Sequence, residues 1–212
     1  MNLPADIAAC ERTSQLYVAS SPPCICRVSA EGVHIHVKCW LPKSASDKLI
    51  PRALSLTATG LLVTTSEELI QFDADGDILR RVRVYQPTHA VQSPAGLLIV
   101  SHKSYWSGKH QVSAVNTAGQ FVCEFRGSDK QPLGFIPHIA VDSKGNILVA
   151  DRDNRRILLL DAQLALRRLI INKDQLNHEQ PVRLCYTEQS GQLLVGLANR
   201  ASVAVFHVLI DG

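Results

Sequence analysis

The stretch HIAVDSKGNILVADRDNRRILLLD, residues 138–161, contains the pattern that decides the fold. In it an apolar run meets a Ser-Lys-Gly-Asn turn, a second apolar run meets a charged turn, and a third apolar run follows. Short apolar runs bounded by glycine and by Asp or Asn are typical of β-strands joined in antiparallel order. The stretch therefore predicts three consecutive strands of one small sheet.

The same pattern occurs in four further places along the chain. The copies begin at Asp6, Ala53, His89, His138 and Arg183, so successive copies are 36 to 49 residues apart. A period of this length, with four short antiparallel strands in each repeat, is typical of the blades of a β-propeller.

A fourth strand in each repeat is predicted from the turns and from alternation of side chains. Glycine turns follow the third apolar run at residues 30–32, 75–76 and 117–119. Glycine supplies the positive φ that tight hairpin turns need. The segment 77–84 then alternates in character, as an outer strand does. The closest competitor for a helix is 161–170, but its place in the repeat favours a hairpin.

The fourth copy also resembles a known family of repeats. Its match to the NHL repeat lies in Gly145, Ile147, Val149, Ala150, Asp151, Asn154, Arg156 and Ile157. The other copies keep the apolar frame and lose the Asp-x-x-Asn-x-Arg part. The resemblance implies a propeller, often six-bladed, that serves as a binding platform in scaffold or ubiquitin-ligase-like proteins. For Asp151, Asn154 and Arg156 the residues themselves favour a structural role, an Asx-type turn with an ion pair that fixes the loop.

The number of blades is left open by the fifth copy, which has no clear fourth strand after VAVFHVLIDG, residues 203–212. A propeller must close, because an open end exposes a strand edge and an apolar flank. We predict a single all-β propeller domain over residues 1–212, either five-bladed or an incomplete six-bladed ring. The incomplete ring is favoured, as a fragment of a longer protein or as a chain completed by a partner.

The composition excludes few functions and favours an intracellular protein. The net charge of +3 comes from 22 basic and 19 acidic residues, which does not by itself suggest binding to nucleic acid or membrane. We find no signal peptide, no apolar run long enough to span a bilayer and no dense cysteine framework. These features predict a reducing, cytoplasmic setting and no membrane partner, and leave the oligomeric state undetermined.

The longest loop after a second strand is the best candidate for binding a partner. It is the segment SHKSYWSGKH, residues 101–110. Aromatic and basic side chains on a loop are typical of protein interfaces. The predicted partner-binding residues are Lys103, Tyr105, Trp106, Lys109, His110 and Arg183. The alternative is that Trp106 folds back and covers the edge of its blade, since large aromatics are usually mostly buried.

Single-stranded RNA is a second candidate partner, because some NHL propellers bind it on a basic face. The residues that could form such a face are Lys103, Lys109, Arg155, Arg156 and Arg183. The small net charge and an aromatic content of 5% argue against it, since few bases could stack. Binding to protein is therefore the preferred function, without catalysis.

A metal-dependent enzyme, lyase-like or lactonase-like, is the third alternative, and related propellers with catalytic metals permit it. Asp6, His89 and His138 occupy equivalent positions at the channel mouth and could bind a divalent ion such as zinc. Ala53 interrupts this ring, and Arg183 would bring a positive charge to it. The competing interpretation is that the histidines hydrogen-bond to backbone carbonyls at the starts of neighbouring strands.

Two other segments could bind metal but have simpler explanations. DADGD, residues 73–77, hints at a calcium loop, yet it stands where a hairpin turn is required. His34 and His36 alternate on one strand near Cys39, and a solvated strand face accounts for them as well. The sequence has no Gly-x-Ser-x-Gly motif and no phosphate-binding loop.

Overall fold

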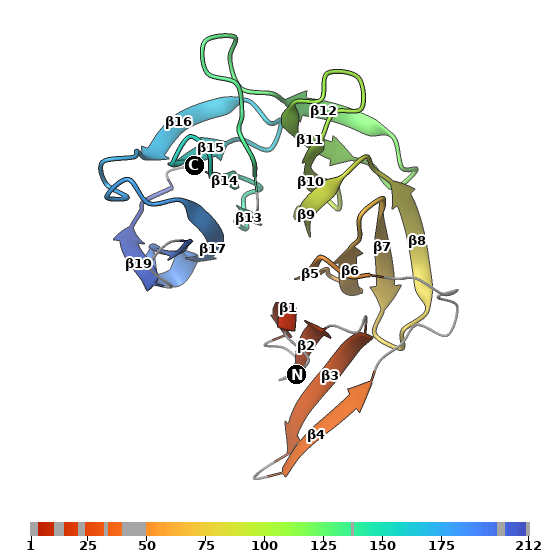
Figure 1. Ribbon diagram of the computed structural model, residues 1–212. Helices are drawn as coiled ribbons and strands as arrows, with labels where there is room; N and C mark the ends of the chain where they lie inside the picture. Colours follow the sequence, from red (N-terminus) through yellow and green to blue (C-terminus); the bar gives the residue numbers. More distant parts are fainter. Residues whose placement is uncertain are drawn as a thin grey trace. The chain divides into compact units, whose positions relative to one another are not determined.

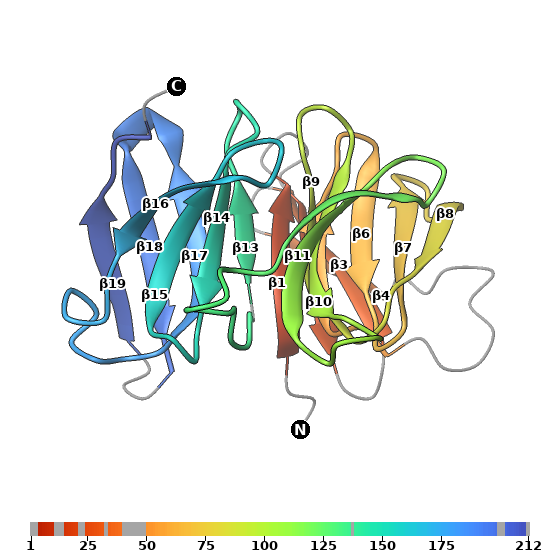
Figure 2. The same cartoon turned by 90° about the horizontal axis from the view of Figure 1, so that it is seen from above.

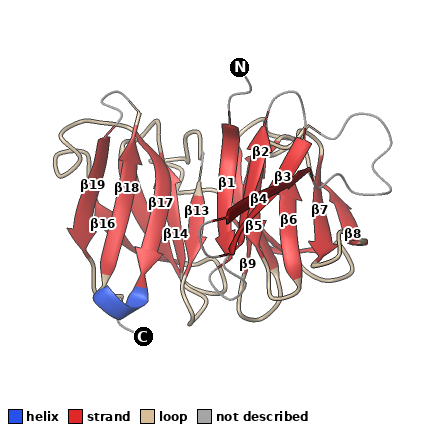
Figure 3. Cartoon of the chain, turned by 90° about the horizontal axis from the view of Figure 1, so that it is seen from below, coloured by secondary structure: helices blue, strands red, loops and turns tan. Residues whose placement is uncertain are grey.

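The structure is a computed structural model, and it describes residues 4–10, 15–20, 24–31, 34–39, 50–136, 138–198 and 202–210. The chain divides into two compact units, Met1–Ala90 and Val91–Gly212, and each is described by itself. Helical structure in the described ranges is limited to the 3₁₀ turn η2, Glu188–Ser190 (Figure 3). No described helix is long and apolar enough to cross a membrane.

The described residues form five small antiparallel sheets, so the fold is an all-β, five-bladed β-propeller (Figure 1). Blade 1 contains β1 Pro4–Cys10, β2 Gln15–Ser20, β3 Cys24–Glu31 and β4 His34–Cys39. Blade 2 contains β5 Ala53–Leu56, β6 Gly60–Thr64, β7 Glu68–Asp73 and β8 Ile78–Arg83. Blade 3 contains β9 Pro87–Gln92, within which the boundary between the units falls, β10 Leu98–Lys103, β11 His110–Val115 and β12 Phe121–Phe125.

Blades 4 and 5 belong to the second unit. Blade 4 contains β13 Ile139–Val141, β14 Ile147–Asp151, β15 Arg156–Leu160 and β16 Leu166–Ile171. Blade 5 contains β17 Pro181–Thr187, β18 Gln192–Leu197 and β19 Ser202–His207, which lie side by side in Figure 2. The predicted repeat and its strand order are thus confirmed, and the predicted outer strands 77–84 and 165–171 are β8 and β16. The fifth copy has three strands in the part of the chain that the structure describes.

The core consists of the faces of neighbouring sheets. All five residues of β14 are buried, because its sheet is covered on both faces. On one side its Val149 packs in a cluster with Ile99 and Ile136 of the same unit. On the other side Leu148 packs with Leu193 of blade 5. The continuous apolar runs that marked each repeat in the sequence are therefore the second strands and the strands beside them.

Four hairpins share one turn in which a side-chain oxygen accepts hydrogen bonds from backbone N–H groups. The residue that begins the turn accepts hydrogen bonds from the backbone N–H groups two and four positions later, and these residues are Asp73, Asn116, Asp142 and Asp161. In three of the turns the fourth position is a glycine with positive φ, namely Gly76, Gly119 and Gly145. Leu164 takes that position in the last turn, with φ 62°.

One of these Asx turns decides a prediction about a loop. Asp73 uses its carboxylate to hold the turn at 73–77, so the hairpin interpretation of that segment is confirmed. Of the predicted turn at 30–32, Ala30 and Glu31 still belong to β3 and pair with β4. Gly32 lies outside the described residues, and nothing is described of the side chains of His34, His36 and Cys39.

Candidate functional site

The predicted binding loop is shorter than the sequence suggested. β10 continues to Lys103 and β11 begins at His110, and these two residues are paired in the sheet. The loop is therefore 104–109, six residues, closed by Ser104 N–H to Lys109 O at 2.8 Å and Gly108 N–H to Ser104 O at 2.9 Å. The prediction of a loop over 101–110 is corrected, because strand pairing extends three residues further on one side than polarity indicated. The result is a tight, hydrogen-bonded turn.

The aromatic residues of this turn face solvent. Trp106 is 92% exposed and Tyr105 is 69% exposed. Their rings meet edge to face, with centroids 5.3 Å apart. Trp106 therefore does not fold back over the edge of its blade. Lys109, in the same turn, is also exposed.

His110 differs from the exposed aromatic residues of the turn, because its side chain is partly buried. Its ring packs edge to face on Phe135, with centroids 5.4 Å apart. Burial lowers the pKa of His110, and the charge of Lys103 acts in the same direction, while Asp153 and Asp151 oppose it. Its Nδ1 atom is buried and has no hydrogen-bond partner among the described residues. His110 therefore supports the base of the turn.

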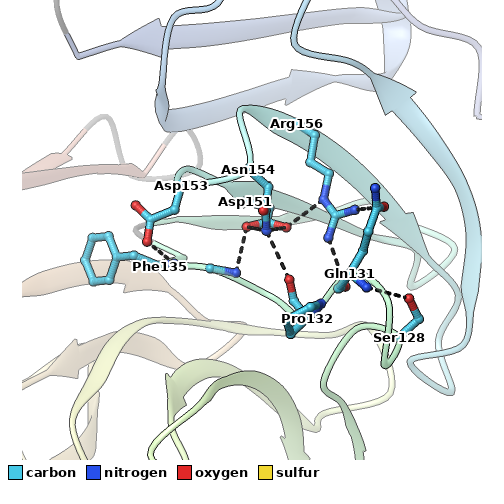
Figure 4. Close-up of polar contacts among 9 residues, drawn as sticks. Ser128, Gln131, Pro132, Phe135, Asp151, Asp153, Asn154 and Arg156 are labelled. Atoms are coloured by element: carbon cyan, nitrogen blue, oxygen red, sulfur yellow. Dashed lines mark hydrogen bonds and ion pairs between the residues drawn. The ribbon is translucent and has the colours of Figure 1, made fainter.

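The segment from blade 3 to blade 4, residues 126–136, is held in place by Asp151. The fully buried Asp151 carboxylate accepts a hydrogen bond from Gly134 N–H at 3.0 Å. It also accepts from Asn154 Nδ2 at 2.8 Å and pairs with Arg156 Nε at 2.7 Å. Figure 4 shows these groups gathered around Asp151. The predicted ion pair of Asp151 with Arg156 is confirmed. The predicted Asx-type turn is not what the carboxylate forms: it accepts from the Asn154 side chain and from the backbone of the preceding segment.

The partners of Asp151 extend that role beyond its own loop. Asn154 Nδ2 donates to Pro132 O at 3.1 Å, and Arg156 Nη1 donates to Gln131 Oε1 at 2.6 Å (Figure 4). The incoming segment is thus attached by side chains that lie 17 to 25 residues further along the chain. No pattern in the sequence indicated these partners, since the NHL-like motif contains only one side of the contact.

Phe135 connects this polar cluster with the aromatic turn. Its N–H donates to Asp153 Oδ2 at 2.9 Å and its carbonyl accepts from Arg152 N–H at 3.0 Å. The Arg152 guanidinium lies 5.7 Å from the centre of its ring, a cation–π contact. With His110 on the same ring, Phe135 joins loops 104–109 and 152–155 into one surface of the second unit. We call this surface the loop face.

Three residues predicted at the channel mouth bond to inner strands of neighbouring blades. In the first unit Asp6 Oδ2 accepts from Leu54 N–H at 2.8 Å, and His89 Nε2 lies 3.2 Å from Ser55 Oγ. In the second unit His138 Nδ1 accepts from Leu184 N–H at 3.4 Å. The competing interpretation predicted carbonyl partners, but two of the three residues accept hydrogen bonds from backbone amides of the next blade.

The surroundings of His138 disfavour a bound cation. Burial lowers the pKa of His138 to about 3, and the positive charge of Arg183 acts in the same direction. Such a charge near the ring opposes a cation as well. Within the described ranges no group of three or more His, Cys, Asp or Glu side chains is arranged to hold a metal ion.

The cations proposed for RNA do not form one equivalent set. Arg156 is paired with Asp151 and bonded to Gln131. Arg155 is exposed on the same loop, where its φ of 52° places it in a left-handed turn. Arg183 is exposed and donates to Val182 O at 3.2 Å. The surface around these residues is therefore less basic than the number of its arginines suggests.

Solved structures share this fold at low sequence identity. A streptogramin B lyase has a TM-score of 0.69 and 12% identity, covering 97% of this chain and 68% of the lyase chain. A catalytically inactive virginiamycin B lyase from Staphylococcus aureus, solved with quinupristin, has a TM-score of 0.64 and 11% identity, covering 100% and 71%. A chain of a nidogen–laminin complex has a TM-score of 0.67 and 15% identity, covering 97% and 80%.

No protein-family model and no curated protein matches the sequence. Because the identities to these solved structures are so low, the likeness establishes the β-propeller fold alone. The function must therefore be argued from this chain's own surfaces.

Proposed function

We propose that this propeller is a non-catalytic protein-interaction module that binds its partner through the loop face. The observation that carries the proposal is the exposed pair Tyr105 and Trp106 on a hydrogen-bonded turn. Burying a tryptophan and a tyrosine at an interface removes much apolar surface from water, which favours binding. A rigid turn also loses little conformational freedom on binding.

The surroundings of the turn support this role. His110, Phe135 and Arg152 hold its base by ring contacts, so the aromatic tips project from a fixed support. Lys109 adds a charge at the rim, where charges affect orientation and association rate more than affinity. The nidogen propeller, solved as a complex with laminin, is a precedent for protein binding on this fold. The scaffold or ubiquitin-ligase-type roles implied by the NHL resemblance, and the cytoplasmic location, remain part of the proposal.

The test compares two exposed aromatic residues of the same blade. Proteins captured by the wild type are compared with those captured by Trp106→Ala and by the control Phe121→Ala, where Phe121 is 51% exposed on β12. A direct titration with the purified partner should then show binding about 30-fold weaker for Trp106→Ala. Equal affinity of all three proteins would overturn the proposal for the loop face.

RNA binding is the competing outcome of the same experiment. Binding to a single-stranded RNA pool would weaken steeply as salt rises, since it releases counterions. Retention of RNA by the wild type that is lost in Lys109→Ala and Arg155→Ala would show that the partner is RNA and not a protein.

A further inference from the structure

The outer edge of blade 5 differs from the outer edges of the other blades. In blades 2, 3 and 4 the third strand lies between two partners, and most of its residues are buried. In blade 5 the third strand, β19, is outermost in the described part of the sheet. Its Val203 and Val205 are 62% and 55% exposed. An edge of this kind offers unpaired backbone groups beside apolar side chains.

The chain that follows β19 does not turn back along it in the described residues. His207 takes the place that Asp161 holds in blade 4, and a histidine does not form the Asx turn. Instead Val208 N–H bonds to Gly191 O at 2.7 Å, and Tyr186 Oη donates to Val208 O at 3.3 Å. Val208 then packs in the core between blades 4 and 5. The residues directly after β19 therefore move away from its free edge.

Edge strands in natural sheets are usually protected by charged side chains. Each of the outer strands β4, β8, β12 and β16 contains at least one Lys, Arg or Glu. The sequence of β19, SVAVFH, contains none of these. β19 therefore lacks the charged side chains that protect the outer strands of the other blades. This indicates that another segment covers its edge.

The sheet face that carries Val203 and Val205 has a definite chemistry. Pairing places Val203, Val205 and His207 on one face, opposite Gly196, Leu194 and Gln192. The next strand adds Arg183 and Cys185 to the same face. Among the paired residues of β17, β18 and β19, this face carries no carboxylate. The Arg183 guanidinium and the His207 imidazole on it therefore favour an acidic partner.

We propose that β19 binds an extended segment of a partner protein, added to blade 5 as an antiparallel fourth strand. The segment has β-branched residues opposite Val203 and Val205, and a carboxylate opposite His207 that accepts a hydrogen bond from the imidazole. Antiparallel order follows from the other four sheets, in which the outer strand runs antiparallel to the third. Backbone hydrogen bonds give such binding its affinity, and the side chains give its specificity. This site is independent of the loop face.

The probe is a fluorescein-labelled hexapeptide, Glu-Thr-Val-Thr-Val-Thr, and the measurement is fluorescence anisotropy with the full chain. Two matched peptides carry N-methyl groups on the odd or on the even backbone amides. Only alternate amides of an added strand face its neighbour. One methylated peptide should therefore bind like the parent, and the other should not bind. Equal binding of both, or no binding of the parent, overturns the proposal.

Variants of exposed residues test the position without disturbing the core. Val205→Lys should weaken binding of the peptide about tenfold. Val122→Lys, at a 58% exposed valine on β12, should leave binding unchanged. His207→Glu should weaken binding of the glutamate peptide about fivefold. The same variant should bind a peptide that has lysine in place of that glutamate. Circular dichroism verifies that each variant is folded, and an equal loss in Val122→Lys would overturn the assignment.

Light scattering distinguishes a second copy of the chain from a different partner. A mass of one chain agrees with the proposal. A mass of two chains that returns to one in Val205→Lys would show that β19 pairs with another copy, which would overturn the proposal.

Discussion

Blades 4 and 5 are built from equivalent sequence repeats in the same unit, yet they end differently. In blade 4 the third strand β15 is covered by β16, and the loop before it is fixed by Asp151. In blade 5 β19 is outermost among the described strands, and Leu197 stands where Asp151 would be. The apolar frame alone is therefore sufficient to form the inner strands, while polar residues decide whether a hairpin and a fixed loop are added.

The largest expected difference between the two blades comes from one substitution made at equivalent positions. Leu159 and Val205 each pair with the second residue of the second strand's apolar run, but they are 2% and 55% exposed. Leu159→Lys should lower the free energy of unfolding by more than about 4 kcal/mol, because it buries a charge. Val205→Lys should change it by less than about 0.5 kcal/mol.

Urea unfolding followed by circular dichroism measures both values. Similar losses for the two variants would mean that β19 is as well covered as β15, and would remove the distinction between the blades.

The second prediction concerns the fixed loop of blade 4. Asp151→Ala should lower the free energy of unfolding by about 3–5 kcal/mol, since it leaves Arg156 and Gly134 N–H without their buried acceptor. Asp153→Ala is the control in the same loop, because Asp153 is exposed and loses one hydrogen bond to Phe135 N–H. Its cost should be about 1 kcal/mol. A comparable cost for both would contradict the central role of Asp151.

The third prediction concerns His138, whose imidazole joins blade 4 to Leu184 of blade 5. With a folded pKa of about 3 and an ordinary value of 6.5, the histidine is neutral in the folded state while the unfolded state takes up a proton. The free energy of unfolding should therefore fall as pH decreases from about 6.5 towards 3, by up to about 1.4 kcal/mol per pH unit.

His138→Asn keeps an acceptor for Leu184 N–H and removes the titration. Its stability, measured by urea unfolding from pH 8 to pH 4, should depend less on pH than that of the wild type, with a constant difference above pH 7. Parallel curves over the whole range would show that His138 does not link stability to pH.

The smallest expected effect is at the hairpin turns. Asp161→Ala removes the acceptor for Gln163 N–H and Ala165 N–H and should cost about 1 kcal/mol, comparable to the loss of a helix cap. His207→Ala, at the equivalent place in blade 5, should cost less than about 0.5 kcal/mol. A larger cost at His207 would show that the end of β19 is held by contacts of its own side chain.

Much of the fold follows from local sequence. The apolar runs and the Asx and glycine turns are separated by few residues, so spacing alone predicted the repeat and the order of the strands. It also predicted that the last copy has no clear fourth strand, in agreement with the three strands that the structure describes there. The choice of strand over helix at residues 161–170 was also local, because Asp161 begins the same turn as Asp73 and Asn116.

The site was harder to predict because it depends on contacts between distant residues. The sequence could not show that Phe135 would pack against His110 and Arg152, or that Gln131 would bond to Arg156. The exposure of Trp106 was also undecided, since an aromatic residue in a loop fits either a covered edge or a projecting tip. The length of the loop depended on the pairing of Lys103 with His110, which polar residues conceal.

The Asx turns also affect the order in which the chain acquires structure. Each connects strands that are adjacent in sequence, so little chain entropy is lost when its hairpin closes, and such hairpins form quickly. Blades 2, 3 and 4 can therefore begin to pair their outer strands before their neighbours are present. In the described residues no such turn follows β19, and β18 is the one strand with which it pairs there. We expect its amide hydrogens to become protected last during refolding, which pulsed hydrogen exchange would detect.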